Sequence, residues 1–129
     1  MIDLVFIGAG GFIGAVSRYL AASWIYRLAG PAFPYGTLCV NVAGSFILCA
    51  FLPLSLHTFN LSPELRSAVT VGFCGAFTTF STFSFETISL LQEGSVTAAL
   101  INIGSNVFLC LAAGWLGVVF SRFFIGGGG

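Results

Sequence analysis

Four long apolar segments, joined by short polar turns, account for nearly the whole of this sequence. They run from about Leu4 to Ile25, Gly36 to Leu56, Leu65 to Leu91 and Val96 to Phe124. Each is long enough, at about 1.5 Å per helical residue, to cross a hydrocarbon core of roughly 30 Å. Lipid offers the backbone no hydrogen bonds, so segments of this length are expected to be helical. The pattern predicts an all-α membrane protein with four transmembrane helices.

The composition agrees with a membrane protein. Only 6% of the 129 residues are charged, whereas a soluble domain carries about 25%. Lysine does not occur and four arginines balance four acidic residues, which argues against a nucleic-acid partner. The single histidine lies in a predicted loop, without the nucleophile–base arrangement of an enzyme. We predict one membrane domain over residues 1–125, a disordered glycine tail at 126–129, and no enzymatic activity.

The distribution of the arginines hardly favours one orientation of the chain in the membrane over the other. Short loops make sequence neighbours antiparallel, so both termini should share one side with Arg66 and Arg122. Arg27 lies on the other side and Arg18 is buried on the approach to it. With the basic residues so nearly balanced, the positive-inside rule barely selects a topology. The alternatives are a single, weakly determined topology and a chain that inserts both ways and pairs antiparallel with itself. We favour the second, because one small four-helix bundle leaves little room for a pore.

The third segment contains a polar stretch at bilayer depth. Residues 72–86 read GFCGAFTTFSTFSFE, in which hydroxyl side chains alternate with phenylalanine before Glu86. Polar segments at this depth persist mainly where they line a pathway or hold an ion. Helical spacing is expected to place the phenylalanines roughly along one face and a second polar set on another: Phe73, Phe77, Phe80 and Phe83, then Thr78, Thr82 and Glu86.

These residues suit weak binding of a small anion. The edge of a phenyl ring is electropositive, and serine and threonine hydroxyls can donate hydrogen bonds. Weak binding in turn suits conduction, because an ion must leave as readily as it enters. Core packing is the alternative explanation of the aromatic rings, although their alternation with hydroxyls is unusual for it.

A break in the third helix is also predicted. Gly72 and Gly75 lower helix propensity, and hydroxyls that bond back to the helix can bend it. A break would release backbone carbonyls, which could coordinate a hard cation such as Na⁺.

Polar residues in the other segments allow two interpretations each. Arg18 is either a structural residue that caps helix ends or pairs with an acid, or a positive charge that concentrates anions in a vestibule. Asn41 forms a stripe with Thr37 and Ser45, which modestly favours a pathway over a single interhelical bond. The fourth segment offers polar residues at helical spacing: Asn102, Ser105 and Asn106. The Gly10–Gly14 pair indicates close helix packing rather than a site.

At these residues the chain resembles the Fluc family of bacterial fluoride channels. The resemblance rests on the 72–86 stretch, on Gly11-Phe-Ile-Gly-Ala-x-x-Arg18-Tyr19, and on Gly36-Thr37-Leu38-x-x-Asn41-x-x-Gly44. Chain length and four-helix layout agree, so it covers essentially the whole chain. It implies a dual-topology antiparallel homodimer in the bacterial inner membrane, with two pores that conduct fluoride passively and selectively.

The resemblance also implies roles for single residues. Phe80 and Phe83 match the phenylalanines that face the pore, and Asn41 matches the pore asparagine. The polar track corresponds to Ser81, Thr82 and Thr37, with Glu86 near its end, and Arg18 matches the vestibule arginine. Gly75 and Thr78 match positions whose backbone carbonyls hold a structural Na⁺ at the dimer interface. The fourth helix carries a polar position that varies in kind, to which Asn102 and Asn106 are assigned.

Two other functions remain open from the sequence. A small dual-topology multidrug exporter would need a membrane-embedded carboxylate as its proton relay, and Glu86 is the candidate. The clustered phenylalanines and hydroxyls, and the lack of an acid in the middle of the first helix, argue against it. A non-conducting scaffold protein would use every polar residue to hold helices together.

Overall fold

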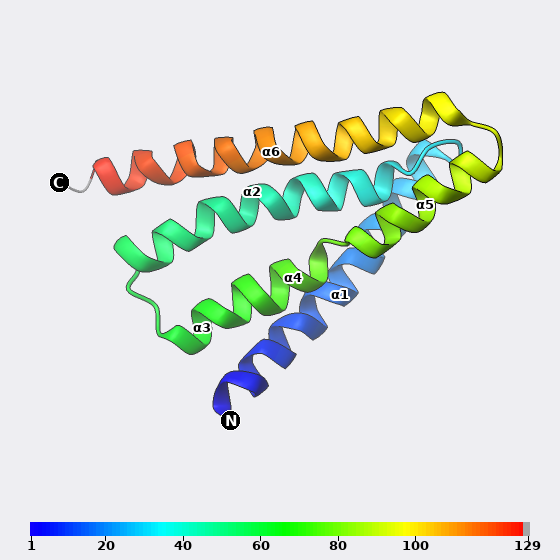
Figure 1. Cartoon of the computed structure of the whole chain (residues 1–129). Helices are drawn as coiled ribbons and strands as arrows, with labels where there is room; N and C mark the ends of the chain where they lie inside the picture. Colours follow the sequence, from blue (N-terminus) through cyan, green and yellow to red (C-terminus); the bar gives the residue numbers. More distant parts are fainter. Residues whose placement is uncertain (128–129) are drawn as a thin grey trace.

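The computed structural model of the chain describes residues 1–127, and these residues form helices joined by short turns (Figure 1). In chain order the elements are α1 (Ile2–Ala29), α2 (Tyr35–His57), α3 (Pro63–Ser67), the π-helical η1 (Ala68–Cys74), α4 (Gly75–Phe77), α5 (Phe80–Gln92) and α6 (Val96–Gly126).

Four helical segments are long and apolar enough to cross a membrane, as the sequence predicts. They are Ile2–Ala29, Tyr35–His57, Pro63–Gln92 and Val96–Gly126. The last of these includes Gly126, the first residue of the predicted glycine tail. The end of that tail, residues 128–129, lies outside the described residues.

Local sequence signals explain where the helices begin and end. Ser62 is the N-cap of α3, and its hydroxyl accepts a hydrogen bond from the Leu65 N–H at 3.3 Å, with Pro63 as the first helical residue. Gly30 and Gly94 have φ of 83° and 81° in the turns after α1 and α5, a conformation that glycine adopts without steric cost.

The third membrane segment changes its helical type along its length. It starts as α-helix in α3, becomes π-helix in η1 and returns to α-helix in α4. At Thr78 (φ −87°, ψ 158°) and Thr79 (φ −151°, ψ 117°) the backbone is extended, and α5 begins at Phe80. The interruption lies three to seven residues beyond the glycines that the sequence singles out, where threonine side chains supply alternative hydrogen bonds.

The helices pack as two pairs that diverge from one end of the molecule (Figure 1). In one pair α2 lies along α6, and at Gly117 of α6 an added Cβ would lie 2.6 Å from the Phe46 carbonyl oxygen. In the other pair α1 lies along α3, η1 and α4. An added Cβ at Gly10 would collide with the carbonyl oxygen of Ala68, and one at Gly14 would collide with the carbonyl oxygen of Phe73. Both of these carbonyls belong to η1. The Gly10–Gly14 pair therefore serves close helix packing, as predicted.

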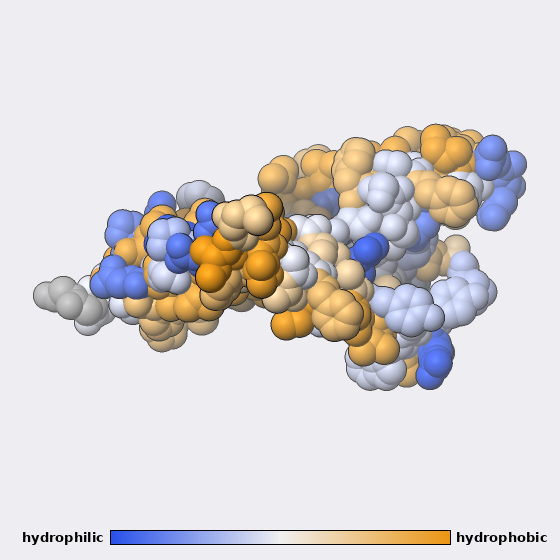
Figure 2. Space-filling model, turned by 90° about the horizontal axis from the view of Figure 1, so that it is seen from below, coloured by the Kyte–Doolittle hydropathy of each residue, from blue (hydrophilic) through white to orange (hydrophobic). Residues whose placement is uncertain are grey.

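The outside of the molecule suits a bilayer. In Figure 2, hydrophobic residues cover much of the middle of the visible face, and hydrophilic residues gather mainly toward the two ends. Both termini and the α2–α3 loop lie toward one end, and the α1–α2 and α5–α6 turns lie toward the other (Figure 1). This is the antiparallel order that the short loops predict.

Candidate functional site

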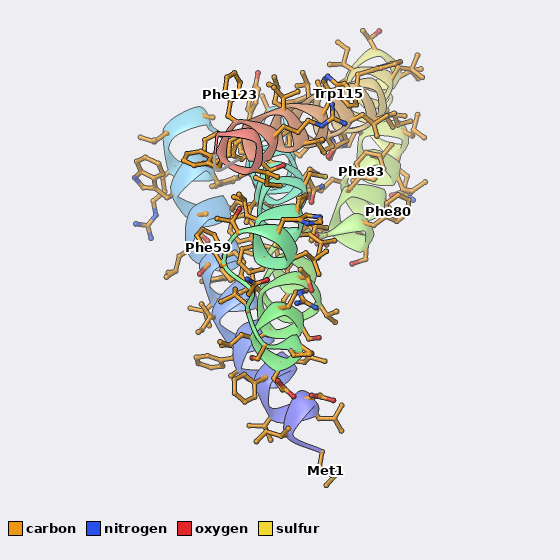
Figure 3. The ribbon with its side chains drawn as sticks, turned by 90° about the vertical axis from the view of Figure 1, so that its left-hand side faces the viewer. Met1, Phe59, Phe80, Phe83, Trp115 and Phe123 are labelled. Atoms are coloured by element: carbon orange, nitrogen blue, oxygen red, sulfur yellow. The ribbon has the colours of Figure 1, made fainter. Side chains whose placement is uncertain are left out.

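Phe80 and Phe83 begin α5 and lie beside each other. Their ring centroids are 5.5 Å apart and the rings are tilted by 50°. The Phe80 side chain is 78% exposed. In Figure 3 both residues lie on the side of the molecule away from α1. The start of α5 thus carries two neighbouring rings, of which Phe80 is exposed and Phe83 is half-buried.

The prediction of one continuous aromatic face is wrong. Phe73 and Phe77 form a separate pair, stacked with centroids 5.4 Å apart and an interplanar angle of 11°. The two extended residues at the interruption change the course of the chain, so the helical spacing does not continue from Phe77 to Phe80. The polar face divides in the same way, because Thr78 lines a different cavity from Thr82 and Glu86.

Asn41 of α2 binds the interrupted backbone in both directions. Its Oδ1 accepts a hydrogen bond from the Thr79 N–H at 2.8 Å, and its Nδ2 donates to the Thr79 carbonyl at 3.1 Å. Nδ2 also donates to Oδ1 of Asn106 at 3.0 Å. Both amide hydrogens of Asn41 are therefore occupied by protein acceptors.

Thr79 caps the helix that follows. Its hydroxyl oxygen accepts from the Thr82 N–H at 3.2 Å, and the hydroxyl donates to Oγ1 of Thr82 at 3.0 Å. Ser81 is exposed, and its Oγ lies 3.4 Å from Oγ1 of Thr79. A threonine with extended backbone at this position is a favourable N-cap, which explains why α5 restarts at Phe80.

Arg18 binds the end of α4. Its Nε donates to the Ala76 carbonyl at 2.9 Å, a carbonyl close to the C-terminal end of the helical segment from α3 to α4. A cation is favourable at such an end because of the helix dipole. Of the two interpretations of Arg18, this hydrogen bond agrees with that of a residue that caps a helix end. Arg18 also lines a cavity of about 190 Å³ together with Thr79 and Thr82.

A buried row of polar side chains connects α6 to α5. Nδ2 of Asn106 donates to Oδ1 of Asn102 at 3.0 Å and to its carbonyl at 2.9 Å. Nδ2 of Asn102 donates to Oγ1 of Thr87 at 3.0 Å, and the Thr87 hydroxyl donates to the Phe83 carbonyl at 2.8 Å. Asn102 is only 1% exposed, so its side chain contacts protein partners rather than open space.

Glu86 is paired with α2. The Thr37 hydroxyl donates to Oε1 of Glu86, and both residues line a cavity of about 670 Å³ between α5 and the α1–α2 turn. The carboxylate of Glu86 therefore lies beside Thr37 of α2, one helical turn beyond Thr82, which lines the same cavity.

Three cavities with shared walls follow the start of α5. The first, of about 360 Å³, is lined by Asn41, Phe80, Phe83 and Asn106. Thr79 lines both this cavity and the 190 Å³ cavity beside Arg18. That middle cavity shares Thr37 and Thr82 with the 670 Å³ cavity at Glu86. Seven of the predicted pore residues thus line adjoining spaces, whereas Ser81 and Asn102 line none of the three cavities.

Gly75 and Thr78 also line the 360 Å³ cavity. In an unbroken helix their carbonyls would accept from the N–H groups of Thr79 and Thr82. Those two N–H groups instead donate to Oδ1 of Asn41 and to Oγ1 of Thr79. The interruption therefore releases both carbonyls from helical pairing. Within residues 1–127 no cluster of three His, Cys, Asp or Glu side chains could hold a metal ion, so any cation here would rely on such carbonyls.

Two residues of this site were not singled out from the sequence, Thr79 and Thr87. Threonine is among the preferred N-cap residues, and that signal was available at Thr79, although Thr82 is not the Glu or Gln that would complete a capping box. Thr87 gives no comparable signal, because its partner Asn102 is 15 positions away and on another helix.

Comparison with known proteins gives one consistent result. Residues 5–118 match the family described as CrcB-like protein, Camphor Resistance (CrcB). A protein of Geobacter metallireducens named "Fluoride-specific ion channel FluC" is 45% identical over 95% of this chain and 98% of its own length. Proteins of the same name from Geobacter sulfurreducens and Hydrogenovibrio crunogenus are 46% and 47% identical, over 95% and 92% of this chain and 98% and 89% of their own lengths.

Proposed function

Since this chain belongs to the CrcB-like protein family, whose similar members are named fluoride-specific ion channels, we propose that it is a fluoride-selective passive channel. The observation that carries the proposal is that the neighbouring rings of Phe80 and Phe83 line one cavity together with Asn41 and Asn106. Electropositive ring edges attract a small anion without holding it tightly. The relatives' names also agree with the expectation that the chain is not an enzyme.

The line of three cavities supports a route for the ion. From the phenylalanine pair it passes Thr79, then Thr82 and Thr37, and reaches Glu86. Threonine hydroxyls can replace part of the hydration shell of fluoride, since each is a donor that rotates to suit its partner. The Arg18 guanidinium beside the middle cavity adds a positive potential, in addition to its bond to Ala76.

Export of fluoride follows from the chemistry of hydrofluoric acid. HF crosses membranes and dissociates in a more alkaline cytoplasm, where F⁻ accumulates. A passive pathway lets the anion leave, because an inside-negative potential favours exit by about 2.3 kcal/mol per 100 mV for each elementary charge. The proposed location is therefore the bacterial inner membrane.

An antiparallel homodimer with two pores completes the proposal. The two helix pairs diverge, so the 360 Å³ cavity between α2, α6 and the third segment is open on one side. Phe80 stands exposed at this cavity. A second copy with the opposite orientation would close it, and the balanced arginines permit insertion in both orientations.

A structural Na⁺ at the dimer interface fits the residues that are present. The released carbonyls of Gly75 and Thr78 would hold it, and hard cations prefer such oxygen ligands. When bound, the ion would offset the partial negative charge of these carbonyls. It would also link the interrupted third segments of the two copies in the dimer.

The test is fluoride efflux from liposomes that contain the purified protein, measured with a fluoride electrode under an inside-negative potential. We expect rapid release of fluoride and no release of chloride under the same conditions. Release of both anions would contradict selectivity. Absence of fluoride release from a folded dimer, with proton-coupled uptake of an organic cation instead, would replace the channel by the exporter and make Glu86 its carboxylate.

A further inference from the structure

The polar side chains behind Phe80 and Phe83 form one directed series of hydrogen bonds. It starts at the Thr79 N–H, which donates to Oδ1 of Asn41, and it ends at the Phe83 carbonyl, which accepts from the Thr87 hydroxyl. In between, each residue donates to the next: Asn41 to Asn106, Asn106 to Asn102, and Asn102 to Thr87. We call the four side chains of Asn41, Asn106, Asn102 and Thr87 the amide relay.

Both ends of the amide relay are attached to the start of α5. Thr79 is the N-cap of this helix and Phe83 lies in its first turn. The side chains between them come from three helices, α2, α6 and α5. The relay therefore holds the turn that carries Phe80 and Phe83 against the α2–α6 pair.

The direction of the relay is set at Thr87. Its single hydroxyl hydrogen is donated to the Phe83 carbonyl, which leaves the oxygen as an acceptor. Asn102 must then turn its NH₂ group toward Thr87 and its Oδ1 toward Asn106. The same logic turns Oδ1 of Asn106 toward Asn41. A flipped amide at any position would set two donors or two acceptors face to face.

Because most of the amide relay is buried, water cannot readily take the place of a lost hydrogen-bond partner within it. Asn102, Thr87 and Asn106 are 1%, 6% and 7% exposed, so water has little access to a side chain that loses its partner. An unpaired buried amide is costly, and aligned hydrogen bonds strengthen one another. A change at Thr87 should therefore alter the orientation of the Asn41 side chain, which lies on another helix and three hydrogen bonds away.

We propose that Thr87 and Asn102 are positioning residues of the conduction site, which act through Asn106 on the orientation of Asn41 and on the first turn of α5. This inference rests on the proposed function. It gives Asn102 a role behind the pore wall, whereas the sequence resemblance assigns it to the pore, and it adds Thr87 as a functional position. Neither side chain has to touch the ion.

Exchange of the side-chain amide protons tests the relay in the unmodified protein. The chain has four asparagines, and Asn60 in the α2–α3 loop is exposed. By NMR in detergent micelles, we expect the NH₂ protons of Asn41, Asn102 and Asn106 to exchange with solvent much more slowly than those of Asn60. Equal exchange rates for all four would overturn the relay without any need for a variant that folds.

Substitution at Thr87 tests transmission. Thr87→Val removes the hydroxyl and keeps the shape, Thr87→Ser keeps the hydroxyl, and Ser84→Ala removes a hydroxyl of α5 that bonds only to the Phe80 carbonyl of the same helix. We expect Thr87→Val to shift the Asn41 amide signals and to lower fluoride flux by about tenfold, a barrier change of about 1.4 kcal/mol. Thr87→Ser should restore both readouts, and Ser84→Ala should leave the Asn41 signals in place.

The outcomes separate this inference from the proposed function. Fluoride flux through the unmodified protein, with Thr87→Val equally active and its Asn41 signals unmoved, would overturn the relay and leave the channel standing. Conversely, absence of fluoride flux through the unmodified protein would overturn the channel, while the exchange rates would still report whether the relay exists. A Thr87→Val protein that shifts the Asn41 signals but conducts normally would contradict the positioning role alone.

Discussion

Phe80 and Phe83 are the residues on which the proposed conduction depends most directly. Both residues line the 360 Å³ cavity, and Phe80 is 78% exposed. An exposed ring at the start of a helix adds little to the packing of one copy. Its value must therefore lie in contact with the ion, with lipid or with a second copy.

Replacement of either ring by an aliphatic side chain separates contact with the ion from contact with lipid or with a second copy. In Phe80→Ile and Phe83→Ile the apolar bulk is largely kept but the electropositive ring edge is lost. We expect fluoride efflux from liposomes to fall by about tenfold or more, a barrier change of at least about 1.4 kcal/mol, while the dimer elutes unchanged in size-exclusion chromatography. Phe123→Ile on α6, with a ring that is 76% exposed, is the matched control. Normal flux in both α5 variants would exclude a site made of ring edges.

Most of the single residues at these cavities are singled out by the sequence, but their hydrogen-bond partners are not. Asn41, Thr37 and Glu86, which the sequence singles out, all lie at the cavities beside α5. The sequence could not show that both amide hydrogens of Asn41 are occupied by Thr79 and Asn106. Such pairings join positions 38 and 65 residues apart, and no local pattern encodes them.

At the scale of the element, the interruption between α4 and α5 is the feature that organises the site. The Thr78 hydroxyl bonds back to the Cys74 carbonyl at 2.9 Å, and Asn41 takes the Thr79 N–H that an unbroken helix would use. Competition for backbone partners by short polar side chains explains the break. The positions of the glycines alone would put the break too early in the chain, since the chain at Gly72 and Gly75 is still helical.

The role of Thr78 in this element is expected to be that of its backbone. Thr78→Ser keeps the hydroxyl that bonds to Cys74 and leaves the released carbonyls in place. We expect this variant to conduct fluoride at close to the unmodified rate in the liposome assay, with Na⁺ present in both solutions. Loss of flux in a correctly assembled Thr78→Ser dimer would argue instead for a specific role of the threonine methyl group.

The contact between α1 and the third segment depends on glycine in a way that can be measured. An added Cβ at Gly14 would meet the Phe73 backbone, whereas at Gly8 of the same helix nothing lies within 4 Å. We expect Gly14→Ala to destabilise the protein by about 1–3 kcal/mol through overpacking, seen as a lower melting temperature in detergent. Gly8→Ala should melt at or slightly above the temperature of the unmodified protein, since alanine favours helix. Equal melting of the two variants would contradict the packing.

At the scale of the whole molecule, two diverging helix pairs leave an open side that a single copy does not fill. The chain is a multi-pass membrane protein with four spans, and its exposed surface includes large apolar residues on every long helix. Lipid can cover such a surface, but it cannot satisfy released carbonyls at Gly75 and Thr78. A second copy can meet both needs, which is why the antiparallel dimer belongs to the proposal.

Dual insertion predicts that one added charge can inactivate the protein. Gln92 is exposed beside the α5–α6 turn and Thr58 is exposed in the loop after α2, on the opposite side of the molecule. Because the arginines are nearly balanced, we expect Gln92→Lys and Thr58→Lys to fix opposite orientations. Each alone should lose most fluoride efflux from cells, and coexpression of the two should restore it.

The controls are Gln92→Ala and Thr58→Ala, which remove the same side chains without adding charge and should conduct. Two coexpressed copies of Gln92→Lys should remain inactive. Full activity of both lysine variants expressed singly would contradict the antiparallel arrangement, since all copies would then share one orientation.

The sequence by itself determined the four spans, their antiparallel order, the close packing at Gly10 and Gly14 and the segment that carries the site. These follow from local properties: apolar length, turn residues and the absence of side chains at glycine. Only the tertiary structure decided where the third segment stops being helical, that its rings fall into two pairs, and that Thr79 and Thr87 take part. Those features arise from competition between backbone and side-chain partners on different helices, and that competition is settled only when α2, α5 and α6 are packed together.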